Sequence, residues 1–292
     1  MASPGVPSAS WRVRPARVVL VALTLVGAGC AQSGSAQVLS RTSSNLARVR
    51  SGTMVMELVA SAGEQGDKDA VGFRLEGPFA LPAPGGFPTA NIRYTQVAGP
   101  NRSIVQLITT GRNGYVAVGG HTYFLPPDQL ERLRAPRTGK QPGQGLQELH
   151  LENWVSGARV SAGQPVEGVA TDRVQGKLQV VNALNDLFSF SRQLSGGGAG
   201  AGVAKIQGDA ANRLRRAVKS SRVELLTGHA DRVLRRLGFE IVLASPVPPA
   251  VRQVLGPLAA PRIRFQLALT DPNKPVTVPE PANPLPASAI PR

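Results

Sequence analysis

Alternation of apolar and polar residues with a period of two is the feature that most limits how this chain can fold. It is cleanest in residues 262–270 (RIRFQLALT), where four apolar side chains share one face and two arginines and a glutamine share the other. The same pattern occurs in residues 52–60 (GTMVMELVA), 71–77 (VGFRLEG) and 91–97 (NIRYTQV). Successive side chains of a strand point to opposite faces, so these segments predict antiparallel strands with one dry face and one wet face.

Turn residues join further strands in the middle and late parts of the chain. Asn113-Gly114 and Gly119-Gly120 suit tight hairpin turns, and Pro126-Pro127 ends the strand that follows them. Residues 156–180 look like two or three strands, and a hairpin is expected about residues 228–231. The sequence therefore predicts one strongly curved antiparallel sheet of about nine to eleven strands.

Helical segments are available to cover the dry face of that sheet. Spacing of three and four residues predicts helices over 37–50 and 181–194, a short helix ending near Trp154, and a basic helix from Asp209, as its N-cap, to Lys219. The fold class is therefore α+β, with one domain over residues 38–270. Residues 271–292 form a Pro-rich C-terminal tail that is predicted to be extended or disordered.

The amino-terminal segment is typical of an export signal. Residues 18–26 (VVLVALTLV) form an apolar run of nine residues, preceded by Arg12, Arg14 and Arg17 and followed by GAGC. A membrane-spanning helix needs about 20 residues, whereas the apolar part of a signal peptide needs about 7–15. We therefore predict a signal peptide over residues 1–29 and a flexible tether over residues 30–37. The alternatives for Cys30 are a buried free thiol and, less readily, a reactive one.

The position of Cys30 resembles the lipobox of bacterial lipoproteins. Gly27, Ala28 and Gly29 are the small residues that precede the cysteine, although Gly27 stands where leucine is usual. The resemblance implies that the Cys30 thiol carries a diacylglyceryl group and that cleavage occurs just before it. The mature protein would then be exported and anchored by lipid to the outer face of the cell membrane, because two or more acyl chains hold a protein firmly.

The charge of the chain is strongly basic, but its distribution does not favour nucleic acid as a partner. The formal charge is +15, of which the signal segment carries three arginines, and aromatic residues make up only 4%. The arginines are scattered rather than grouped with aromatic residues. Solvated arginine on strand and helix faces is the simpler interpretation, and attraction to anionic lipid headgroups is the alternative.

Enzymatic chemistry and cofactors find no support in the sequence. His121, His150 and His229 each lack a second metal ligand at helical or hairpin spacing, and no G-x-S-x-G motif occurs. The sequence therefore predicts no catalytic residue, no metal site and no cofactor.

The order of elements is similar to that of a known family. The meander "GRNGYVAVGGHTYFLP", the strand pair "VEGVATDRVQGKLQV" and the segment "PVTVPEP" follow one another after the lipobox and first helix. This order resembles the mycobacterial-type envelope lipoproteins with a LolA-like fold, the LppX/LprG-like group, over residues 38–281. The resemblance implies a half-barrel sheet covered by helices, with an apolar space between them for the acyl chains of a lipid or lipoprotein that is transported or presented.

The apolar faces of the early and late strands supply the candidate lining of this space. Core packing is the alternative for each single residue. The early strands contribute Met54, Met56, Leu58, Phe73, Leu75, Ile92 and Tyr94, and the late strands contribute Leu237, Phe239, Ile241, Phe265 and Leu267. The expected partners are an acylated ligand and the bacterial membrane. Two alternatives remain open: a structural or interaction lipoprotein without lipid cargo, and a sensor or accessory subunit of a membrane transporter.

Overall fold

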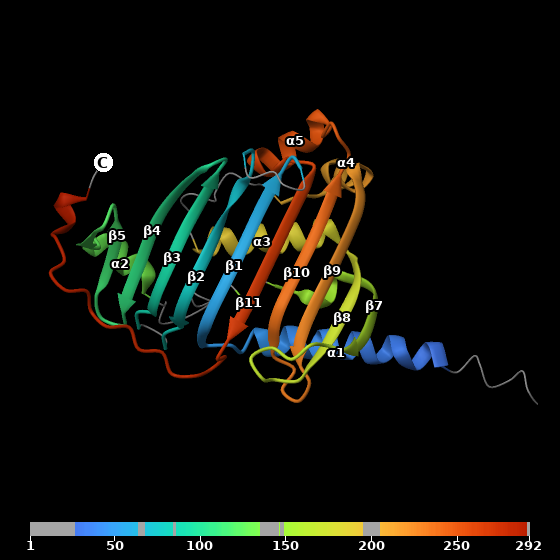
Figure 1. Cartoon of the computed structure of the whole chain (residues 1–292), viewed down its shortest axis with the longest axis horizontal. Helices are drawn as coiled ribbons and strands as arrows, with labels where there is room; N and C mark the ends of the chain where they lie inside the picture. Colours follow the sequence, from blue (N-terminus) through green and yellow to red (C-terminus); the bar gives the residue numbers. More distant parts are fainter. Residues whose placement is uncertain are drawn as a thin grey trace, which may run out of the picture.

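The computed structural model describes residues 27–63, 68–83, 86–134, 146, 149–194 and 205–290, without the side chains of 27–33 and 191–194. Its centre is an antiparallel sheet of 11 strands in the order β6-β5-β4-β3-β2-β1-β11-β10-β9-β8-β7 (Figure 1). The strands are β1 (Ser51–Ser61), β2 (Val71–Ala80), β3 (Thr89–Ala98), β4 (Asn101–Thr110), β5 (Gly114–Val118), β6 (His121–Phe124), β7 (Val155–Ala162), β8 (Thr171–Leu178), β9 (Val218–Gly228), β10 (Leu234–Leu243) and β11 (Arg262–Thr270). The predicted strand number and α+β class are confirmed.

Helices lie against one face of the sheet, which we call the inner face, and the opposite side is the outer face. In Figure 1, α3 crosses behind the central strands, while α1 crosses behind the lower ends of β10, β9 and β8 and continues beyond β7. The helices are α1 (Gly27–Leu46), α2 (Pro127–Leu133), α3 (Val180–Leu194), α4 (Gly208–Ala217) and α5 (Pro249–Leu255), with a 3-10 turn η2 (Leu151–Asn153) before β7. Short 3-10 turns also follow α5 (η3, Gly256–Leu258) and end the tail (η4, Ala287–Ala289).

The centre of the sheet is where the two ends of the domain meet. β1 pairs with β2 on one side and with β11 on the other, so that Met56 lies opposite both Leu75 and Leu267. Residues directly opposite in an antiparallel pair share a face. Their side chains form a continuous apolar row on the inner face.

Two helix boundaries differ from the sequence expectation. The first helix begins at Gly27 rather than near residue 37, so residues 30–37, expected as a flexible tether, have helical backbone. Ala31 and Ala36 favour this continuation, because alanine loses no side-chain entropy in a helix, whereas Ser33, Gly34 and Ser35 do not favour it. Helix α4 takes Gln207 as its N-cap residue, places Asp209 in its first turn and ends at Ala217, so Lys219 belongs to β9.

The Pro-rich tail packs against the sheet. The Asn113 side-chain amide donates to Glu280 Oε1 at 2.7 Å, and the Leu285 amide donates to the Thr122 carbonyl at 2.8 Å. Val278 is buried on the outer face against Ile108 and Tyr115. The tail is extended, as predicted, but it is ordered through residue 290 because it covers apolar side chains and pairs with the edge strand β6.

Among the helices that the structure describes, none combines the length and the apolar character needed to cross a bilayer. Residues 1–26, which include most of the expected signal peptide, lie outside the described residues.

Candidate functional site

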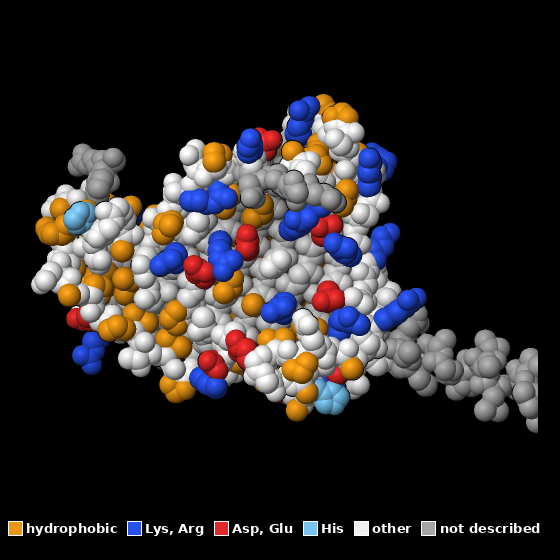
Figure 2. Space-filling view, in the orientation of Figure 1, with side chains coloured by type: hydrophobic (Ala, Val, Ile, Leu, Met, Phe, Trp, Pro, Cys, Tyr) orange, Lys and Arg blue, Asp and Glu red, His pale blue; other side chains and the backbone are white. Residues whose placement is uncertain are grey.

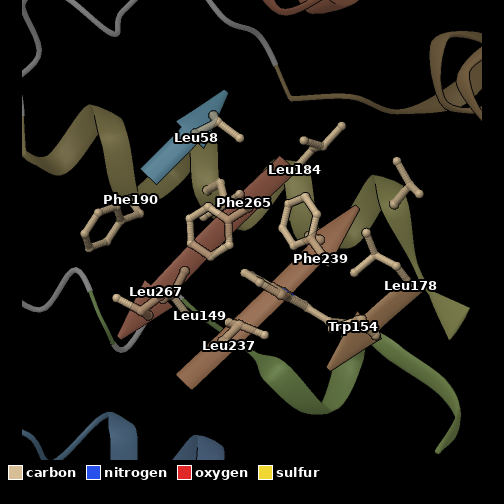
Figure 3. Packing of buried hydrophobic residues seen from close by; sticks show 14 of the residues in the cluster. Leu58, Leu149, Trp154, Leu178, Leu184, Phe190, Leu237, Phe239, Phe265 and Leu267 are labelled. Carbon is tan, nitrogen blue, oxygen red and sulfur yellow. The ribbon is translucent and has the colours of Figure 1, made fainter. Parts of the chain in front are cut away.

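The inner face of β1, β11 and β10 is a packed core. Phe239 and Phe265 lie directly opposite each other on β10 and β11, with stacked rings whose centroids are 5.1 Å apart. Figure 3 shows these rings side by side with Trp154 lying across them. Eight of the predicted lining residues are buried in this core: Met54, Met56, Leu58, Leu237, Phe239, Ile241, Phe265 and Leu267. Their side chains are packed among neighbouring apolar side chains on the inner face.

Trp154 closes the packed core from the helical side. Its ring meets those of Phe239 and Phe265 edge-on, at centroid distances of 6.1 Å and 6.4 Å. Its indole N–H donates to Asp186 Oδ2 of α3 at 2.7 Å, and the Trp154 side chain is fully buried. The hydrogen bond satisfies the one polar atom of the indole, so the ring fills the space between sheet and helix without leaving an unpaired donor.

The inner face of β2 and β3 is covered less completely. Phe73 and Leu75 lie opposite Leu58 and Met56 and continue the apolar rows, but both are only partly buried. On β3, Ile92 is partly buried, and Tyr94 is 37% exposed. The four predicted lining residues on β2 and β3 therefore form the edge of the core, where apolar surface still meets solvent.

Three inner-face residues that the sequence analysis did not single out extend this region. Val105 lies opposite Tyr94, Leu107 lies opposite Ile92, and Val116 lies opposite Leu107, all with partial burial. We call Phe73, Leu75, Ile92, Tyr94, Val105, Leu107 and Val116 the open inner face. The alternation of apolar and polar residues is not visible in the sequence of β4, because Ile104 and Ile108 are apolar on the outer face as well. Ile108 packs there against Val278 of the tail.

The outer face bears a hollow whose lining includes several charged and amide side chains. A hollow of about 640 Å³ lies over Gly238, whose missing side chain leaves the surface between Glu224 and Gln266 open. Arg264 donates to Glu240 Oε2 at 2.9 Å and holds the pKa of that carboxyl below its usual value. Arg264 and Arg222 both form ion pairs with Glu240, and Glu224 accepts from Gln175 Nε2 at 2.6 Å. Figure 2 shows that acidic and basic side chains are mixed on this face.

The histidines occupy polar surface positions. His121 is exposed in the edge strand β6, His150 Nδ1 lies 3.4 Å from Asp186 Oδ2, and His229 Nδ1 lies 2.7 Å from Asp172 Oδ1. Within the described ranges no three His, Cys, Asp or Glu residues come together as metal ligands would. The backbone of Cys30 lies in the first turns of α1, and its side chain lies outside the described set.

Comparison with known proteins finds similarity only among solved structures. No protein-family model matches the chain, and no curated protein matches it. LprF from Mycobacterium bovis is 14% identical over 86% of this chain and 98% of its own, with a TM-score of 0.45. The lipoprotein LppX of Mycobacterium tuberculosis is 12% identical over 83% of this chain and 98% of its own, with a TM-score of 0.37.

Proposed function

We propose that this protein is an exported, membrane-anchored lipoprotein that binds the acyl chains of a lipid or lipoprotein and carries or presents them. The observation that carries the proposal is the open inner face, a set of aliphatic and aromatic side chains in register across β2 to β5 with only partial burial. Apolar surface of this kind gains about 25 cal/mol for each Å² that a ligand removes from water. An acyl chain supplies such cover without needing a polar partner.

The division of the inner face into two parts supports this placement. Beneath β1, β11 and β10 the core is filled by Trp154, Leu184 and their neighbours, which leaves no need for a ligand there. Beside it, Leu75 and Phe73 border the core with partly exposed side chains. An acyl chain that lies along β2 and β3 would continue the core outward. The proposal therefore keeps the predicted lining residues of β2 and β3 and leaves out those of β1, β10 and β11.

Tyr94→Glu is expected to lower acyl-lipid binding by roughly tenfold or more, because it places an unpaired carboxylate against the acyl chain. The variant protein should still fold, because the Tyr94 side chain is 37% exposed. The measurement is native mass spectrometry of the full-length protein purified from bacterial membranes in mild detergent, with extraction and identification of bound lipid.

Thr95→Glu is the matched control, because Thr95 is the next residue of β3 and its side chain points to the outer face. It adds the same charge and should leave the bound lipid unchanged. Equal loss of lipid in both variants, or a protein without any extractable acyl lipid, would contradict the proposal and favour an interaction lipoprotein without cargo.

Cys30→Ser is expected to move the protein from the membrane fraction to the soluble fraction, because the proposed anchor supplies about 0.8 kcal/mol for each buried CH₂. Fractionation of the producing bacteria, combined with metabolic labelling by an alkyne fatty acid, measures this. A Cys30→Ser protein that remains labelled and membrane-bound would exclude Cys30 as the acylated residue.

A further inference from the structure

A second hollow lies at the end of the sheet where β8 finishes and β9 begins. It encloses about 240 Å³, and three elements supply its cationic side chains: β8 gives Lys177, α4 gives Arg215 and β9 gives Lys219. Ser220, Gln179 and Asn182 supply its polar groups. The hollow is on the far side of the molecule from the open inner face, because β8 and β9 are separated from β2 by β10, β11 and β1.

The charged residues that line this hollow are all positive. Its lining residues include three cations and no carboxylate. Among the residues that the structure describes, no carboxylate forms an ion pair with Lys177, Arg215 or Lys219; Arg215 donates instead to Asn212 Oδ1 at 3.0 Å. The outer-face hollow differs in this respect, because its Arg264 and Arg222 both pair with Glu240.

The surface around the hollow extends the same positive charge. Arg213 and Arg216 are exposed on α4, and Asp209 is the acidic residue of that helix. Figure 2 shows Lys and Arg side chains along the rim formed by α4, β9 and β8. Like charges gathered on one surface repel one another, and a bound anion removes that repulsion.

We propose that this hollow binds the phosphate of an anionic lipid headgroup at the membrane surface. Several ammonium and guanidinium groups around a small polar hollow are the donors that suit a phosphate group. The exposed arginines of α4 beside the hollow favour a surface that carries many phosphates over a single soluble ion. This binding goes beyond the acyl-chain binding proposed above and uses different residues.

The experiment compares vesicles of phosphatidylcholine alone with vesicles that also contain phosphatidylglycerol. The protein is the full chain with Cys30→Ser, so that acylation of that residue cannot attach it to the vesicles. We expect it to sediment with the phosphatidylglycerol vesicles only. Adding Lys177→Gln and Lys219→Gln should weaken this association about 30-fold, since each basic residue near an anionic surface contributes about 1 kcal/mol. Both lysines are exposed, so the fold should be retained.

The matched control replaces two exposed arginines at the opposite end of the sheet, Arg48→Gln and Arg112→Gln, which removes the same charge. Its association should change less than twofold. Equal weakening by both pairs would show attraction to net charge alone and overturn the site. The site would also be overturned if the protein bound neither kind of vesicle. The same holds if calorimetry showed that it binds soluble glycerol phosphate as tightly as it binds the vesicles. The Lys177→Gln, Lys219→Gln variant that retains Cys30 should still yield extractable acyl lipid. Failure of the phosphate site is therefore distinguishable from failure of the proposed acyl-chain binding.

Discussion

Trp154→Ala should lower the free energy of unfolding by about 3–5 kcal/mol, the range for removing a buried aromatic side chain. The substitution removes two edge-on contacts, with Phe239 and with Phe265, and leaves a cavity between the sheet and α3. It also deprives Asp186 of the indole donor at 2.7 Å. A loss of this size is a large part of the stability of a typical domain.

Urea unfolding followed by far-ultraviolet circular dichroism measures this effect. Val160→Ala is the control, because Val160 is exposed on the edge strand β7, and its removal should change the free energy of unfolding by less than about 0.5 kcal/mol. The slope of the transition should stay the same in both variants. A change below about 1 kcal/mol for Trp154→Ala would mean that the core around the indole is loosely packed.

Phe265→Glu should prevent folding altogether. Phe265 is 1% exposed, stacked on Phe239 and surrounded by apolar side chains, so the new carboxylate would have no polar partner and no water. Burying an unpaired charge costs several kcal/mol even after the pKa of the group has shifted. We expect no near-ultraviolet circular dichroism and little soluble monomer.

Ala268→Glu is the control for this change. Ala268 lies on the same strand but on the outer face, directly opposite Arg236 of β10, where a carboxylate can be solvated and paired. It should leave folding and yield unchanged. A folded Phe265→Glu protein would instead show that water or an open cavity reaches the centre of the inner face. Charged substitutions in the late strands thus test folding, and the open inner face is the place to test acyl binding.

The strands were predictable wherever one face is dry and the other wet. In β11 and β1 every second residue is buried, so the sequence period is the burial period. The hairpin before β10 and the meander of β4 to β6 were predictable from their turn residues, because glycine adopts the positive φ angles found at Gly119 and Gly120.

The limits of the prediction come from contacts between segments far apart in sequence. Phe265 and Tyr94 both occupy the apolar positions of an alternating strand sequence. Phe265 is nevertheless buried under Trp154, whereas Tyr94 is partly exposed. Their difference depends on which helix lies above each strand, which local periodicity does not encode. The docking of Val278 against Tyr115 likewise joins residues more than a hundred positions apart.

The pairing of β1 with β11 also has a kinetic consequence. Thr53 lies opposite Thr270, so the pair that joins the two halves of the sheet closes a loop of almost the entire domain. A chain delivered from its amino-terminal end can form its hairpins early, but the sheet stays divided until the last strand arrives. Until then β1 presents an unpaired edge beside an apolar face, the kind of surface on which chains associate wrongly. Completion of this sheet is therefore a late event in folding, and until then the protein depends on whatever shields that edge.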